Sequence, residues 1–140
     1  MIAKEQLLLA QYLSEIRFKK HEYGIFDCNT WWATWIDRLS GSNVSKDIIG
    51  KYDSIETAIE YAKTHNALDY VLATGYTELD DNKLESIPIN GDVWIQNFKT
   101  HYTGVIIFNG LGWSVTSNQG LIKNLPEYYD RPFTKKFRRF

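Results

Sequence analysis

The fold of this chain is decided by residues 27–39, which read DCNTWWATWIDRL. Their apolar positions repeat with the i, i+3, i+4, i+7 spacing of one helix face, and a face that carries three tryptophans has to be buried. Asp27 is a favourable N-cap residue, and Gly41 is a favourable residue just beyond a helix end. The stretch therefore predicts a core helix with Cys28 in its first turn. The apolar face consists of Cys28, Trp31, Trp32, Trp35, Ile36 and Leu39.

Further helices are expected on both sides of this one. Residues 3–18 carry an apolar stripe of helical period and predict a helix that precedes the tryptophan-rich one. Another helix is expected to start at Asp53 or Ser54, because Asp53 and Glu56 have the spacing of a capping box. A shorter helix is expected over 68–74. All of the predicted helices therefore come before the first predicted strand.

From Gly91 onward the pattern changes from helical to strand-like. Polar residues 78–86 are expected to form the loop that leads there, and Asn109-Gly110 is a typical turn sequence of a β-hairpin. Helices first and strands afterwards indicate an α+β domain, in which an antiparallel sheet packs on the tryptophan-rich helix. The expected strands cover residues 93–95, 102–108, 113–116, 121–122 and 133–140.

Length and charge narrow the class of protein. The chain has 140 residues, 44% of them hydrophobic, which is the size and apolar content of one packed domain. We expect this domain to cover 1–140, with an N-terminal helix in 1–20 and a C-terminal extension at 126–140. The net charge of −1 does not favour a nucleic-acid binder. The last six residues nevertheless carry four cations, which indicates a solvated strand or tail, a phosphate-binding segment, or a surface for an acidic partner.

The sequence also argues against several kinds of site. A single cysteine excludes an internal disulfide and a cysteine-rich metal site, and three histidines without paired spacing give no other metal site. We expect no cofactor. No apolar run approaches the ~20 residues of a membrane span, and the N-terminal residues show no signal-peptide pattern.

Cys28 is the candidate nucleophile. At the start of a helix, unpaired N–H groups and the positive end of the dipole stabilise a thiolate and lower the pKa of the thiol. A thiolate nucleophile also needs a base and a group that orients the base. A lone cysteine on an apolar helix stripe is more often a small core residue, so its position alone leaves both roles open.

Short motifs beyond Cys28 occur in an order typical of one peptidase superfamily. Residues 23–28 read YGIFDC, residues 91–94 read GDVW, and residues 103–110 read TGVIIFNG. Together they resemble the NlpC-type branch of the papain-like cysteine peptidases. The chain is more closely similar to an uncharacterised NlpC-like family common in bacteriophage genomes. The resemblance covers residues 20–125 and implies a papain-like NlpC-type fold.

The resemblance also assigns roles to three positions. Cys28 matches the nucleophile, and Ser114 matches the position that orients the base. The base itself is expected two residues before Gly104, where this chain has Tyr102, and His101 lies one residue earlier. Because side chains alternate along a strand, His101 and Tyr102 cannot both face the thiol unless a bulge re-aims one of them. Tyr102 is a poor base at neutral pH, since the ordinary pKa of tyrosine is ~10.

Two functions follow from the resemblance. One is a phage virion-associated structural or adaptor protein of the neck or tail, made in the bacterial cytoplasm, whose partners are other virion proteins or further copies of itself. The other is a cysteine peptidase or amidase that cleaves peptidoglycan stem peptides. Cys28 would attack, His101 would take the proton and Ser114 would orient the imidazole. Tyr102 and Ser114 differ from the catalytic residues that the family has at these positions, and this difference favours the structural function. An accessory protein that binds a host target is a third option, which the sequence neither favours nor excludes.

Overall fold

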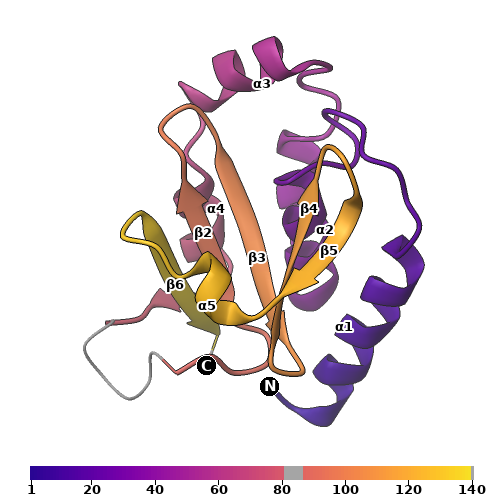
Figure 1. The fold of residues 1–140 in the computed structure, drawn as a ribbon, viewed down its shortest axis with the longest axis vertical. Coiled ribbons are helices and arrows are strands. Elements are labelled where there is room, and N and C mark those ends of the chain that lie inside the picture. Colours follow the sequence, from indigo (N-terminus) through magenta and orange to yellow (C-terminus); the bar gives the residue numbers. More distant parts are fainter. Residues whose placement is uncertain (81–86, 140) are drawn as a thin grey trace.

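A computed structural model describes residues 1–80 and 87–139, and within them the chain forms five α-helices and one six-stranded antiparallel sheet (Figure 1). The predicted α+β class is confirmed. The helices are α1 (Ala3–Ile16), α2 (Thr30–Ser40), α3 (Ile55–Ala62), α4 (Ala67–Ala73) and α5 (Pro126–Tyr129), with a 3-10 turn at Val44–Asp47. The strands are β1 (Tyr76–Glu78), β2 (Val93–Asn97), β3 (Tyr102–Phe108), β4 (Leu111–Thr116), β5 (Gly120–Asn124) and β6 (Thr134–Arg139).

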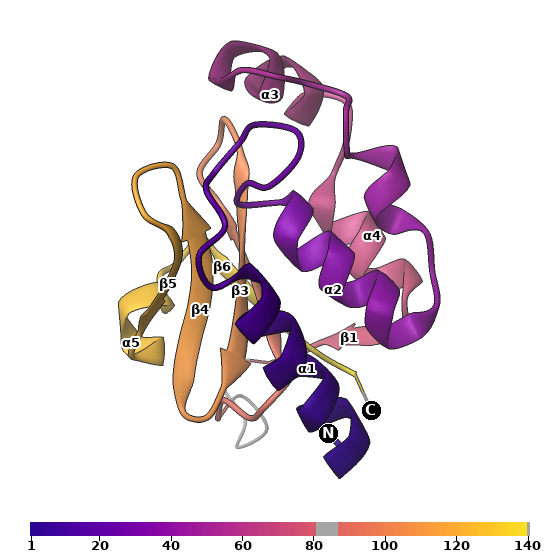
Figure 2. The same ribbon diagram turned by 90° about the vertical axis from the view of Figure 1, so that its right-hand side faces the viewer.

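The sheet has the strand order β1-β6-β2-β3-β4-β5, so the last strand of the chain lies between β1 and β2. Val93 of β2 pairs with Ile106 of β3 on one side and with Phe137 of β6 on the other. Figure 2 shows α2 and α4 on one face of the sheet and α5 on the other, with α1 beside α2. The C-terminal segment is therefore an integral part of the sheet.

The main core lies between the helices and the sheet. The side chains of Trp31, Trp32 and Trp35 are each 0% exposed, which confirms the prediction of a buried tryptophan-rich helix. They pack with apolar residues of α1 and with alternate residues of the strands, such as Ile106. A smaller cluster on the opposite sheet face consists of Trp94, Val105, Ile107 and Tyr129. Both faces of the central strands are therefore covered.

Several boundaries differ from the sequence prediction. The expected loop over 78–86 begins inside β1, whose Glu78 pairs with Phe137 of β6; residues 81–86 of that loop lie outside the described residues. The capping box of α3 is formed by Ser54 and Thr57, whose backbone N–H donates to Ser54 Oγ at 3.1 Å, and not by Asp53 and Glu56. The predicted hairpin turn is confirmed, because β3 and β4 pair on either side of Asn109-Gly110.

Candidate functional site

The turn that carries Cys28 is fixed by the Asp27 carboxylate. Asp27 Oδ1 accepts hydrogen bonds from the backbone N–H groups of Asn29 and Thr30, each at 2.9 Å, and Oδ2 accepts one from Gly24 N at 2.8 Å. Gly24 has to be glycine here, because a Cβ at this position would lie 1.8 Å from the carbonyl oxygen of Tyr52. The N-cap residue of α2 is Asn29 and not Asp27 as predicted, because α2 begins at Thr30, so Cys28 lies in the turn just before the helix.

Cys28 is docked directly on β3. Its backbone carbonyl accepts a hydrogen bond from Gly104 N at 3.0 Å, and its thiol donates to the carbonyl oxygen of Tyr102 at 3.3 Å. Trp31 Nε1 donates to Gly104 O at 3.0 Å. A Cβ on Gly104 would lie 1.9 Å from the Trp32 ring, so a side chain here would force the helix away from the strand. These contacts hold the thiol at the start of β3.

The prediction of a lowered pKa for Cys28 is wrong. Burial, and after it the charge of the neighbouring Asp27 carboxylate, raise the pKa of the Cys28 thiol to about 12. Hydrogen bonding with Thr103 and with the Cys28 backbone lowers the pKa, but burial and the Asp27 charge raise it by more. The thiol is therefore protonated at neutral pH.

His101 lies in the turn between β2 and β3, one residue before β3 begins. This turn is held by hydrogen bonds from Lys99 N to Asn97 Oδ1 at 2.9 Å and from Phe98 N to His101 O at 2.9 Å. The His101 ring stacks on Phe98, with centroids 5.2 Å apart, and its Nδ1 lies 3.1 Å from Thr100 Oγ1. Burial lowers the pKa of His101, so its ring is neutral at neutral pH. The side chain is thus directed by the turn and not by the pleat of the strand.

Two adjoining cavities meet at Cys28. The inner cavity, of about 50 Å³, lies between Cys28 and α3, and most of its lining is aromatic or aliphatic. The outer cavity, of about 420 Å³, reaches from Cys28 to Ser114 and contains more polar groups. His101 lines both cavities, and Tyr102 lines the inner one. Both side chains can reach the neighbourhood of Cys28 because His101 precedes the regular strand.

Ser114 belongs to a buried polar cluster on the opposite face of the sheet. It is 2% exposed, and its hydroxyl lies 2.9 Å from the hydroxyl of Tyr129. The carbonyl oxygen of Tyr129 accepts hydrogen bonds from Gln96 Nε2 at 3.0 Å and from Thr134 Oγ1 at 2.7 Å. The described contact of the Ser114 hydroxyl is therefore with α5 and not with His101. No pattern in the sequence points to Tyr129, because the four-residue helix that carries it is too short to show a helical period.

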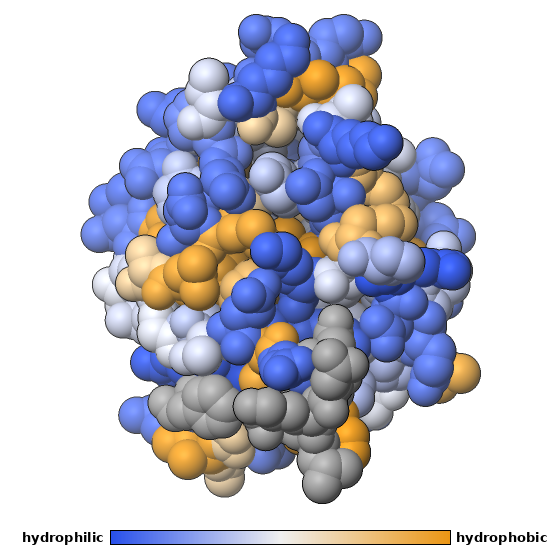
Figure 3. Space-filling model, turned by 90° about the vertical axis from the view of Figure 1, so that its left-hand side faces the viewer, coloured by the Kyte–Doolittle hydropathy of each residue, from blue (hydrophilic) through white to orange (hydrophobic). Residues whose placement is uncertain are grey.

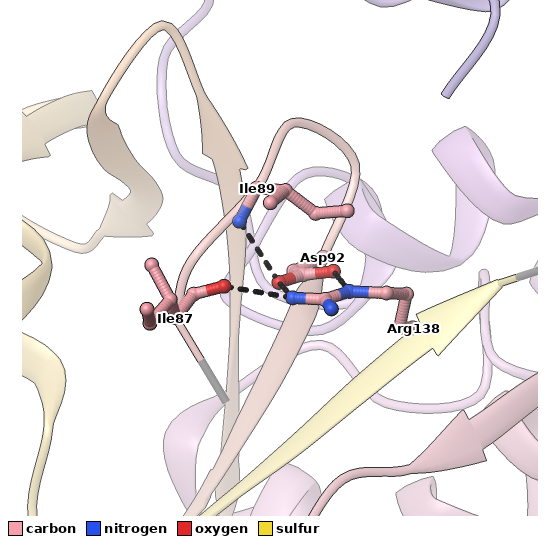
Figure 4. A network of polar contacts seen from close by, with 4 residues as sticks. All are labelled: Ile87, Ile89, Asp92 and Arg138. Atoms are coloured by element: carbon pink, nitrogen blue, oxygen red, sulfur yellow. Dashed lines mark hydrogen bonds and ion pairs between the residues drawn. The ribbon is translucent and has the colours of Figure 1, made fainter. Parts of the chain in front are cut away.

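Asp92 forms a buried ion pair with Arg138 (Figure 4). Arg138 donates from Nε to Asp92 Oδ1 and from Nη2 to Asp92 Oδ2, each at 2.8 Å, and Nη2 also donates to Ile87 O at 2.8 Å. Ile89 N donates to Asp92 Oδ2 at 3.1 Å. Arg138 and Lys136 are 8% and 7% exposed, so the interpretation of the basic C-terminus as a solvated strand or tail is wrong for both of them. The aspartate of the GDVW motif thus anchors the last strand to the turn before β2.

Residues 1–80 and 87–139 contain neither a metal-binding cluster nor a membrane-spanning helix. Across residues 1–80 and 87–139, no group of three or more histidine, cysteine, aspartate or glutamate side chains is placed to hold a metal ion. In the same part of the chain, no helix has the length and apolar character needed to cross a membrane.

The fold and the site define an α+β domain in which a cysteine precedes the central helix and faces the start of a sheet strand. The family described as "Domain of unknown function (DUF6950)" matches residues 3–128, so the chain belongs to that family. No curated protein matches the sequence.

Proposed function

We propose that this chain is a virion-associated structural or adaptor protein of a bacteriophage, built on a papain-like NlpC-type fold in which Cys28 has no catalytic role. One observation carries the non-catalytic part of the proposal. The Cys28 thiol donates to the backbone carbonyl of Tyr102, and its pKa is raised to about 12. At pH 7 the thiol is therefore protonated, whereas a cysteine hydrolase needs the thiolate.

The partners of Cys28 in a catalytic triad are occupied elsewhere. The His101 ring stacks on Phe98 and contacts Thr100, and the Ser114 hydroxyl contacts Tyr129. A working triad would require the thiol, the imidazole and the serine to exchange these contacts for one another. Because three contacts would have to change at once, a structural role for these residues is the simpler interpretation.

The assignment to a phage particle rests on the resemblance of residues 20–125 to an NlpC-like phage family. An adaptor needs exposed side chains that can be buried against partners. Figure 3 shows that apolar residues reach the surface of one face in separate patches, divided by hydrophilic ones. Exposed large apolar side chains include Phe18, Leu72, Phe98, Leu125 and Phe133. Such patches suit contacts with several neighbours, among them further copies of this chain.

The test is made on purified phage particles of the strain that encodes this chain. We expect mass spectrometry to detect the protein in the particles, and we expect a deletion to stop assembly or infection. A phage that carries Cys28→Ala should assemble and infect like the wild type. Particles without the protein, or a deletion that leaves both assembly and infection intact, would contradict the structural function.

A second function is favoured by one observation: Cys28 and His101 line the same two cavities. In a cysteine peptidase or amidase acting on peptidoglycan stem peptides, His101 would accept the thiol proton and Cys28 would attack the amide carbon. His101 would return the proton to the leaving amine as the C–N bond breaks, and water would then hydrolyse the thioester and free Cys28. The test is release of soluble fragments from purified cell wall. Release that is lost in both Cys28→Ala and His101→Ala supports the enzyme. If the wild type releases nothing, or Cys28→Ala releases as much as the wild type, the enzymatic function fails.

A further inference from the structure

Helix α3 stands apart from the rest of the fold. Figures 1 and 2 both place it at one end of the molecule, beyond the turn between β2 and β3 and away from the face of the sheet. None of its residues is buried, although it has an apolar face, and Ile55 at its start is 40% exposed. Most helical stability in proteins comes from the packing of such a face. Its contacts with the main core come from Ala58 and Tyr61, which are only partly buried, so little packing holds α3 in place.

The inward side of α3 forms one wall of the inner cavity. This wall consists of Ile55, Ala58, Tyr61 and Ala62, and the opposite wall includes Cys28, Trp32 and Tyr102. Ile55 also lines the outer cavity, so its side chain lies where the two cavities adjoin. A displacement of α3 would remove this wall, and the two cavities would become one space beside Cys28.

Ala58 and Tyr61 of α3 pack, partly buried, against the main core, and Tyr61 also makes the described polar and ring contacts with neighbouring segments. The Tyr61 hydroxyl donates to the carbonyl oxygen of Asp47, and the Tyr61 ring lies 5.5 Å from that of Tyr52. The Tyr61 ring also stacks on His65, with centroids 3.8 Å apart. The remaining described hydrogen bonds, such as the one from Thr57 N to Ser54 Oγ, stay within the segment and preserve the helix if it moves.

The two ends of the segment are fixed. Tyr52 before α3 is 8% exposed, and Ala67 after it is 6% exposed. Tyr52 is also held by the close approach of Gly24, whose own carbonyl accepts a hydrogen bond from Gly50 N at 2.9 Å. A helix without buried residues between two buried ends is the arrangement of a flap, since local opening is easiest where few apolar contacts are lost.

We propose that α3 is a lid over Cys28: residues 53–66 swing about fixed ends at Tyr52 and Ala67, with Tyr61 as the latch. In the open position the inner and outer cavities are continuous, and Cys28, which is partly exposed with α3 in place, becomes more accessible from solvent. This inference goes beyond the proposed function and does not depend on it, because a lid would control access to Cys28 in an adaptor or in an enzyme.

The experiment measures the rate at which N-ethylmaleimide modifies the purified chain, followed by intact mass. The readout is specific because the chain has one cysteine. We expect Tyr61→Ala to react at least about tenfold faster than the wild type, because the latch is removed. Ile55→Ala, at an exposed position, should also react faster. The matched control is Glu60→Ala, on the same helix but paired only with the exposed Lys63 at 2.9 Å, and it should react like the wild type.

Low concentrations of urea separate lid opening from global unfolding. If α3 opens alone, the modification rate stays nearly constant with urea below the unfolding transition, because little surface is exposed by opening. Backbone amides of α3 should also exchange with deuterium much faster than those of α2. The proposal is overturned if Tyr61→Ala and Ile55→Ala both react at the wild-type rate, or if the rates rise with urea in parallel with global unfolding.

Discussion

Replacing Arg138 with alanine should leave the buried Asp92 carboxylate without its charged partner. Asp92 is 1% exposed, and Arg138 supplies it with two hydrogen bonds of 2.8 Å. The same guanidinium donates to Ile87 O, so the substitution also leaves that carbonyl without its donor. Removing one partner of a buried ion pair costs about 3–5 kcal/mol of unfolding free energy. A domain of ordinary stability has about 5–15 kcal/mol, so the variant should fold but be strongly weakened.

The assay is urea unfolding followed by the fluorescence of the five tryptophans. With a slope of about 2 kcal/mol per molar urea, a loss of that size lowers the midpoint by about 2 M. Arg139→Ala is the matched control, because Arg139 pairs at 3.0 Å with the partly exposed Glu5, and a surface pair contributes about 0–1 kcal/mol. Midpoints for the two variants that agree within about 0.5 M would refute the reasoning.

Three further predictions test the packing and the chemistry of the site. Gly104→Ala should lower the unfolding free energy by about 1–3 kcal/mol or more, because its Cβ would lie 1.9 Å from Trp32; an unchanged melting temperature would contradict this. The pKa of Cys28 is raised from 9.0 to about 12, so its neutral thiol stabilises the fold below pH 9.0 and this contribution is lost as the pH rises towards 12. The wild type should therefore lose more stability than Cys28→Ser over that range, as measured by urea unfolding at each pH. Ser114→Ala and Tyr129→Phe should show a coupling free energy of about 0.5–1.5 kcal/mol in a double-mutant cycle, and additive effects would exclude their hydrogen bond.

The parts of the fold that depend on neighbouring residues could be predicted from the sequence. The tryptophan-rich helix is encoded by the spacing of its own apolar residues, and the β3–β4 hairpin by Asn109-Gly110. The position of β6 could not be predicted, because its pairing with β1 and β2 joins segments far apart in the chain. The burial of Arg138 follows from that pairing. The composition of the C-terminal segment, with its four cations, does not distinguish a central strand from a solvated tail.

The protonation state of the Cys28 thiol is predicted wrongly from the sequence for a related reason. The expected lowering of its pKa assumes that the N–H groups at the start of the helix are free, whereas the Asp27 carboxylate accepts from two of them. The surroundings of Cys28 also depend on where α3 lies, because residues of α3 line the same cavity, and no local pattern reports that position. A cysteine at the start of a helix is therefore predicted to be reactive only when the capping of the helix and the burial of the thiol are also known.

The orientation of His101 shows the limit of arguments from strand register. Alternation requires His101 and Tyr102 to point to opposite faces, yet both line the inner cavity, because β3 begins only at Tyr102. The direction of the His101 ring is set by the turn before it, where Lys99 has a φ of 71° and Asn97 accepts the Lys99 N–H. Whether this site can perform chemistry therefore depends on the freedom of that turn and of α3, and the two variants Tyr61→Ala and His101→Ala address these separately.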